Sequence, residues 1–291
     1  MRPIRAKTAT TGVLPKRFLI STLRRLGQEV GFTLPTLAAP GNGAGGRPAL
    51  PLRVRVYRAG RAVHQIDVTP EAGQSRIEVW QAQWETGLGP GNGEDLIAVE
   101  YLHGREDEPW LGPIMRHDIQ GQFLVRDAAT GRYSSVLASM VPFRAAGFKF
   151  TPIISLAHCY KFGPEWENYT LFLNLKGPDG GDGGNRMHVD YHGFDGARLA
   201  ASDFVVPYNG GFLLPVETTL ARLGVADGAL SGGVISHCRG GASQFAIFTL
   251  IRNRRSGAIG LEHSLPPYYY VTGLRHPAIR GPFYRRALAP A

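Results

Sequence analysis

The chain has 291 residues, of which 43% are hydrophobic and 19% are charged, and it contains 38 glycines and 21 prolines. This composition suits one large β domain or two to three modules, and it favours short strands joined by turns over long helices. The formal net charge is +9, and no apolar run is long enough for a transmembrane helix or a secretory signal peptide. Because two cysteines do not make a disulfide framework, a cytoplasmic or otherwise reducing compartment is expected.

The first predicted element is a basic amphipathic helix within an N-terminal arm, residues 1–32. Apolar residues between 14 and 32 recur at helical spacing, arginines lie along the flank, and Gly31 is a stop signal. The apolar residues in question are Phe18, Leu19, Leu23, Leu26 and Val30. Residues 33–51 form a linker rich in proline, glycine and alanine, so the folded body is expected to begin near Leu52.

The body contains a motif that recurs three times, each time as a glycine turn, a strand that ends at proline, and another glycine turn. Pro70, Pro142 and Pro207 follow Gly60, Gly131 and Gly196 by 10, 11 and 11 residues. Similar strands flank each copy, which indicates three degenerate repeats of a four- or five-strand unit. The predicted segments are the arm 1–32, the linker 33–51, the repeats 52–120, 121–186 and 187–272, and a basic tail 273–291.

Short alternating strands that are joined by glycine and ended by proline are typical of antiparallel sheets. The sequence therefore predicts an all-β fold, an antiparallel sandwich or barrel built from these repeats together with the N-terminal helix. The only other helix candidate is residues 217–225, ETTLARLGV.

Residues 187–253 resemble the bacterial sensory rhodopsin transducer family. The resemblance is carried by HVDYHGFDG at 188–196, VVPY at 205–208 and FLLPVETTL at 212–220. It implies a small soluble β-sandwich that oligomerises and works as an adaptor without catalysis. No catalytic residue is transferred by it.

The stretch MHVDYH at 187–192 admits two interpretations. In a strand, His188, Asp190 and His192 share one face, and Met187, Val189 and Tyr191 share the other. The first trio is a candidate set of ligands for a divalent metal such as zinc, with His237 reaching in from a neighbouring strand. The preferred interpretation is the polar outer face of an amphipathic strand, with no cofactor.

Two further groups of residues are candidates for binding. The basic ends suit an acidic protein surface, nucleic acid or an anionic membrane surface, or they simply solubilise the chain. The candidate partner-binding arginines are Arg17, Arg24, Arg25, Arg280, Arg285 and Arg286. Trp110 and Trp166, which fall in predicted loops, are candidates for stacking on a sugar or base or for anchoring an interface.

The sequence states no reaction, because motifs such as G-x-S-x-G, the P-loop and H-E-x-x-H do not occur. It favours a non-enzymatic binding or assembly protein, structural or adaptor in kind, tethered to a protein partner or homo-oligomer by its basic arms. The alternatives are a metal-dependent enzyme that uses the His188 face and a carbohydrate-binding accessory protein.

Overall fold

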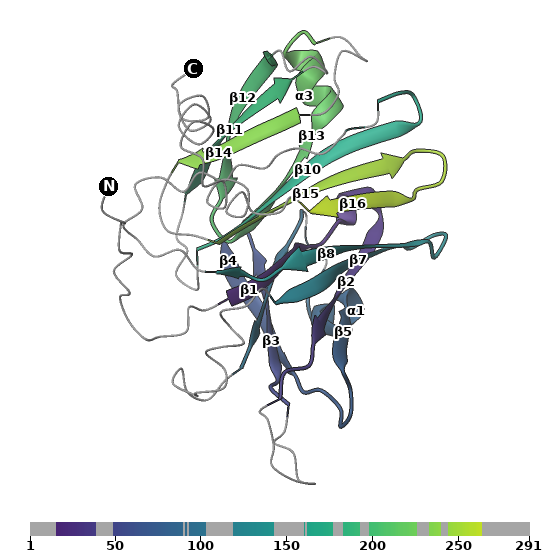
Figure 1. Ribbon diagram of the computed structural model, residues 1–291, viewed down its shortest axis with the longest axis vertical. Helices are drawn as coiled ribbons and strands as arrows, with labels where there is room; N and C mark the ends of the chain where they lie inside the picture. The colour runs from purple at the N-terminus through teal and green to yellow at the C-terminus, as the bar shows by residue number, and fades with distance from the viewer. Residues whose placement is uncertain are drawn as a thin grey trace, which may run out of the picture.

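A computed structural model describes most of the chain, and it is rich in strands, as the sequence predicts (Figure 1). The described residues are 16–38, 49–89, 91, 93–102, 119–142, 160, 162–176, 183–192, 198–225, 233–239 and 244–263. Every strand pairing in these ranges is antiparallel. The all-β fold class and the sandwich-like packing of antiparallel sheets are therefore confirmed.

The N-terminal half forms two sheets, in the orders β4-β3-β6-β1-β9 and β5-β2-β7-β8. Its strands are β1 (Lys16–Ser21), β2 (Gln28–Pro35), β3 (Leu52–Arg58), β4 (Arg61–Val68), β5 (Arg76–Trp80), β6 (Leu96–Tyr101), β7 (Gln120–Asp127), β8 (Tyr133–Ser139) and β9 (Val141–Pro142). A short 3-10 turn, η1 (Arg24–Leu26), joins β1 to β2, and a short helix, α1 (Gln81–Glu85), follows β5.

The C-terminal half forms two more sheets, in the orders β13-β10-β15-β16 and β12-β11-β14. Its strands are β10 (Trp166–Leu175), β11 (Gly184–His192), β12 (Arg198–Pro207), β13 (Gly210–Pro215), β14 (Gly233–Arg239), β15 (Gln244–Asn253) and β16 (Ile259–His263). The helix α3 (Val216–Arg222) follows β13 and overlaps the candidate helix at 217–225, which confirms a helix there, although it begins one residue earlier and ends at Arg222.

The sheet that contains β10 and β15 is a shared wall between the two halves. Leu171, Leu173 and Phe248 belong to the core of the N-terminal half, whereas Phe172 and Ile247 belong to the core of the C-terminal half. Alternate residues of one strand face opposite sides of its sheet, so this sheet is buried on both faces. A strand of this kind contains consecutive apolar residues, as LFL does at 171–173.

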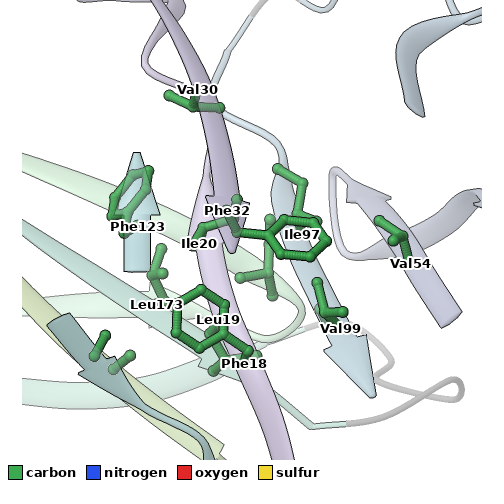
Figure 2. Close-up of a cluster of buried hydrophobic side chains, with 14 of the residues drawn as sticks. Phe18, Leu19, Ile20, Val30, Phe32, Val54, Ile97, Val99, Phe123 and Leu173 are labelled. Carbon is green, nitrogen blue, oxygen red and sulfur yellow. The ribbon is translucent and has the colours of Figure 1, made fainter. Parts of the chain in front are cut away.

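The N-terminal core gathers side chains from β1, β2, β3, β6 and β7, with Leu173 reaching in from β10 (Figure 2). The Phe18 and Phe32 rings lie 6.3 Å apart, and Phe32 stacks on the buried Trp84 of α1 at 6.0 Å. The Phe123 ring of β7 meets the Phe248 ring of β15 edge to face at 5.2 Å. Aromatic pairs of this geometry contribute beyond their buried area, and here one of them joins the two halves.

The predicted N-terminal helix is wrong, because residues 16–21 and 28–35 are strands inside the fold. β1 pairs with β6 on one side and β9 on the other, and Phe18, Leu19 and Ile20 are all buried. A strand buried on both faces lacks the alternation that separates strands from helices, so its apolar residues also fit helical spacing. Gly27, with φ of 67°, breaks the pattern where the chain turns into β2. β2 also extends to Pro35, into the predicted linker.

The repeat stays a prediction, although two of its glycines do lie in turns. Gly60 and Gly131 lie in the β3–β4 and β7–β8 hairpin turns with φ of 82° and 68°. Gly196, the third repeat glycine, lies outside the described residues. Within the described ranges no helix has the length and apolar character needed to cross a bilayer.

Phe248→Ala should destabilise both halves together, because Phe248 is fully buried in the shared wall. Loss of a buried phenylalanine typically costs about 3–5 kcal/mol of unfolding free energy. Urea unfolding followed by circular dichroism and by tryptophan fluorescence should give one coincident transition, shifted to lower urea. Tyr133→Ala, at a side chain that is 56% exposed, is the control. A second transition that Phe248→Ala leaves unshifted would show that the halves unfold independently.

Candidate functional site

A groove of about 570 Å³ lies where the two halves meet. One wall comes from the N-terminal half, from η1, the β3–β4 turn and the segment that enters β6. The other wall comes from the C-terminal half, from the β12–β13 turn and the residue before β11. The lining residues are Arg25, Arg58, Ala59, Gly60, Gly93, Glu94, Asp95, Gly183, Pro207, Tyr208, Gly210 and Gly211.

Asp95 anchors two arginines beside the groove. Its Oδ1 accepts a hydrogen bond from Arg58 Nε at 3.0 Å, and its Oδ2 accepts from Arg58 Nη2 and Arg24 Nη1, both at 2.9 Å. The Asp95 side chain is only 2% exposed. Its hydrogen bonds raise the pKa of Arg58 above the ordinary value, so Arg58 stays cationic. Arg24 also pairs with Glu85 of α1.

Glu94 organises the turn that carries Arg24 and Arg25. Its Oε2 accepts from the Arg24 backbone N–H at 2.9 Å, and its Oε1 accepts from the Arg25 backbone N–H at 3.0 Å. The hydroxyl of Thr22 also donates to Oε2 at 3.1 Å. These N–H groups open the 3-10 turn and have no partner within it, so the carboxylate takes the place of a cap.

Asn209 ties the two walls together at one end of the groove. It is fully buried and has a φ of 50°, in the left-handed region that asparagine tolerates in tight turns. Its Oδ1 accepts from the Lys176 backbone N–H at 2.9 Å, and its Nδ2 donates to the Gly60 carbonyl at 3.2 Å. One side chain therefore joins the end of β10, the β12–β13 turn and the β3–β4 turn.

Two groups on the walls stay available to a ligand. Within the part of the chain that the structure describes, no ion pair engages the Arg25 guanidinium, and Arg25 is exposed. On the opposite wall, Tyr208 presents its ring, with the Lys176 ammonium 4.2 Å from the ring centroid. The groove thus offers a free cation on one wall and an aromatic ring on the other.

Among the arginines that the sequence suggests for partner binding, two hold the fold instead. Arg17 donates to Glu100 at 2.8 Å and to Gln244 of β15 at 3.0 Å, and so bridges the two halves. Arg24 is fixed by Asp95 and Glu85, and only Arg25 faces the groove. The remaining candidates, Arg280, Arg285 and Arg286, lie outside the described residues.

The candidate metal residues sit in the outer sheet of the C-terminal half. Met187, Val189 and Tyr191 of β11 are buried, as the strand interpretation predicts, so positions 188, 190 and 192 belong to the other face. The register sets His188 opposite Asp203 of β12 and opposite His237 of β14. Among the side chains that the structure describes, no three metal-ligating residues cluster. The metal alternative stays a prediction.

Trp166, one of the two candidate stacking tryptophans, is not among the residues that line the groove. Trp166 begins β10 and is partly buried, and its backbone N–H donates to the Gly163 carbonyl at 3.1 Å. Trp110 lies outside the described residues. The aromatic residue that does line the groove, Tyr208, is not a candidate site residue in the sequence analysis, although the stretch VVPY at 205–208 contains it.

No protein-family model and no curated protein matches the chain. Among solved structures, it is similar to a β-glucuronidase 2 of Bacteroides uniformis, at 10% identity over 86% of this chain and 26% of that one, with a TM-score of 0.18. It is also similar to a glycosyl hydrolase family 2 member of Bacteroides cellulosilyticus, at 8% identity over 85% and 27% of the two chains, with a TM-score of 0.17. A third similar structure is a lectin of Pleurotus ostreatus, at 9% identity over 87% of this chain and 82% of that one, with a TM-score of 0.16.

The chain thus spans about a quarter of the length of the first two proteins. TM-scores this low give no information about the function of this chain.

Asp95→Ala should destabilise the protein by about 3 kcal/mol or more, because it leaves Arg24 and Arg58 without their buried counter-charge. Asp67→Ala is a matched control, since Asp67 makes the same two-bond pair with Arg53 but its side chain is 43% exposed. Exposed pairs contribute about 1 kcal/mol or less. Chemical denaturation of both variants checks the difference, and equal losses would contradict a buried role for Asp95.

Val189→Asp should destabilise by roughly 3 kcal/mol or more, because it buries an unpaired charge in the C-terminal core. Val205→Asp is its control on the neighbouring strand, since that side chain is 53% exposed and should tolerate the change to within about 1 kcal/mol. Thermal melts of the two variants test the register of β11. Reversed sensitivities would place His188 rather than Val189 on the core side.

Proposed function

We propose that this chain is a non-enzymatic binding protein of the β-sandwich type, and that it holds its ligand in the groove between its two halves. The observation that carries the proposal is the composition of that groove. Both halves supply its walls, and Arg25 and Tyr208 face it from opposite sides. Ligand sites commonly lie at such junctions, where two rigid elements meet.

The carboxylates of the groove favour binding over catalysis. A pair of acids next to each other, as at Glu94 and Asp95, would suggest acid–base chemistry if one of them were placed to exchange a proton with a substrate. Here Glu94 caps the 3-10 turn and Asp95 anchors two arginines. Both carboxylates therefore have structural partners, and they stabilise the conformation of the groove walls.

The size and rigidity of the groove support a small ligand rather than a protein partner. A volume of about 570 Å³ falls within the usual range for small-molecule sites, roughly 300–1,000 Å³. The wall turns are fixed by Asn209 on one side and by Asp95 on the other. A site preorganised in this way loses little conformational entropy when the ligand binds.

Assembly through the basic ends is a separate part of the proposal. Arg17 and Arg24 are engaged within the fold, so a tether to an acidic partner would rest on the C-terminal arginines Arg280, Arg285 and Arg286. Groove binding and tethering are compatible, because an adaptor can hold a small ligand at one surface and a partner at another.

Filling the groove should abolish ligand binding without unfolding the protein. Gly93 lines the groove, and a side-chain carbon added there would lie 4.0 Å from Arg25 Nη2, so Gly93→Trp places an indole at the wall without a clash at its base. Saturation-transfer NMR with a library of small acids, sugars and nucleotides should find compounds that bind the wild type and not Gly93→Trp. These compounds should be recovered unchanged.

Gly89→Trp is the matched control for this experiment. Gly89 lies in the same connection and has open space around it, but it does not line the groove. It should bind the same compounds as the wild type. If every compound that binds does so equally in both variants, or if a bound compound is chemically converted, the proposed function is wrong.

A further inference from the structure

Building on the proposed function, we propose that the groove selects ligands that carry a carboxylate or phosphate group. The Arg25 guanidinium holds that group, and the Tyr208 ring contacts the remainder of the ligand.

Three arginines lie at or beside the groove but differ in their partners. Arg58 makes two hydrogen bonds to Asp95, at 3.0 and 2.9 Å, and a third to the Gly89 carbonyl at 2.9 Å. Arg24 is bound to Asp95, to Glu85 and to the Gly93 carbonyl. Both guanidinium groups are therefore oriented by the fold and neutralised by nearby acids.

Arg25 differs from its neighbour because only its backbone is fixed. The Arg25 N–H donates to Glu94, which sets the course of the turn, while the side chain lines the groove. Within the described residues the three acids nearby, Glu85, Glu94 and Asp95, already hold Arg24 and Arg58 or cap the turn. The Arg25 charge is thus the one that a ligand can neutralise.

The opposite wall adds a second positive group beside an aromatic surface. Lys176 lies over the Tyr208 ring, with its ammonium 4.2 Å from the centroid. Lys176 does not itself line the groove, but its positive charge beside the Tyr208 ring adds to the attraction that Arg25 exerts on anions. A tyrosine ring contacts flat or apolar ligand surfaces, and its hydroxyl both donates and accepts hydrogen bonds. This wall suits the body of a ligand whose charged end meets Arg25.

Arginine chemistry defines the class of ligand. The planar guanidinium forms two parallel hydrogen bonds to a carboxylate or to a phosphate, and such charge-assisted bonds are about twice as strong as neutral ones. Carboxylate and phosphate groups share this mode of binding. The geometry of the groove therefore defines a single class of anionic ligand, and the anionic group can be either a carboxylate or a phosphate. The experiment therefore includes one carboxylate probe and one phosphate probe, both six-carbon derivatives of glucose.

Isothermal titration calorimetry with four probes tests the proposal: D-gluconate, D-glucose 6-phosphate, inorganic phosphate and D-glucose. At least one of the two sugar anions should bind the wild type more tightly than D-glucose does. Arg25→Gln, which removes the charge and leaves a shorter, neutral polar side chain, should weaken that binding about tenfold or more. Arg61→Gln is the control, because Arg61 is exposed at the start of β4 and does not line the groove. It should leave binding unchanged.

The remaining outcomes separate the ligand class from the binding site. If D-glucose binds as tightly as the anions, or if Arg25→Gln binds them like the wild type, the anionic class is wrong. If none of the probes binds at millimolar concentration, the class is wrong as well. The groove itself fails only if no compound of the larger library distinguishes Gly93→Trp from Gly89→Trp. If inorganic phosphate alone binds as tightly as D-glucose 6-phosphate, Tyr208 has no part in recognition.

Discussion

Burial of the β13-β10-β15-β16 sheet on both faces is the constraint on which the rest of the structure depends. Leu171 and Leu173 pack into one core and Phe172 into the other, so one strand belongs to both halves. Polar residues on the second face are tolerated because each has a partner. Thr170 meets the Tyr160 hydroxyl at 2.7 Å, and Asn174 donates to the Val206 carbonyl at 3.1 Å. A buried polar group without such a partner would cost more than the hydrogen bond contributes.

The groove follows from how the shared wall meets the N-terminal half. β13 passes so close to β1 that a side-chain carbon on Gly211 would lie 3.2 Å from Ser21 Oγ. At its end the wall is joined to the other C-terminal sheet by the β12–β13 turn, and Asn209 in this turn donates a hydrogen bond to the Gly60 carbonyl. The two halves thus touch at the floor and at one end, and the space between these contacts stays open.

Sequence patterns predict the local elements well because their causes are local. The β3 and β7 hairpins show alternation and glycine turns, and α3 shows its helical spacing. They fail at β1, where burial on both faces hides the strand period. The groove could not be predicted in this way. Arg58 and Asp95 are 37 residues apart and Asn209 and Gly60 are 149 apart, so their contacts depend on the tertiary fold and have no characteristic spacing.

Part of the positive charge of the chain stabilises the fold and is not available to bind a partner. The sequence places the excess of basic residues at the two ends, and that pattern suggests docking arms. Yet Arg17 links β1 to β15 through Gln244, and Arg24 neutralises a buried aspartate, so these charges stabilise the fold. Arg25 follows Arg24 directly, and its backbone N–H donates to Glu94, but its guanidinium has no acidic partner in the described chain. The net charge therefore overstates the number of arginine side chains that are free to bind a partner. An unpaired charge that lines a groove is the better indication of a binding site.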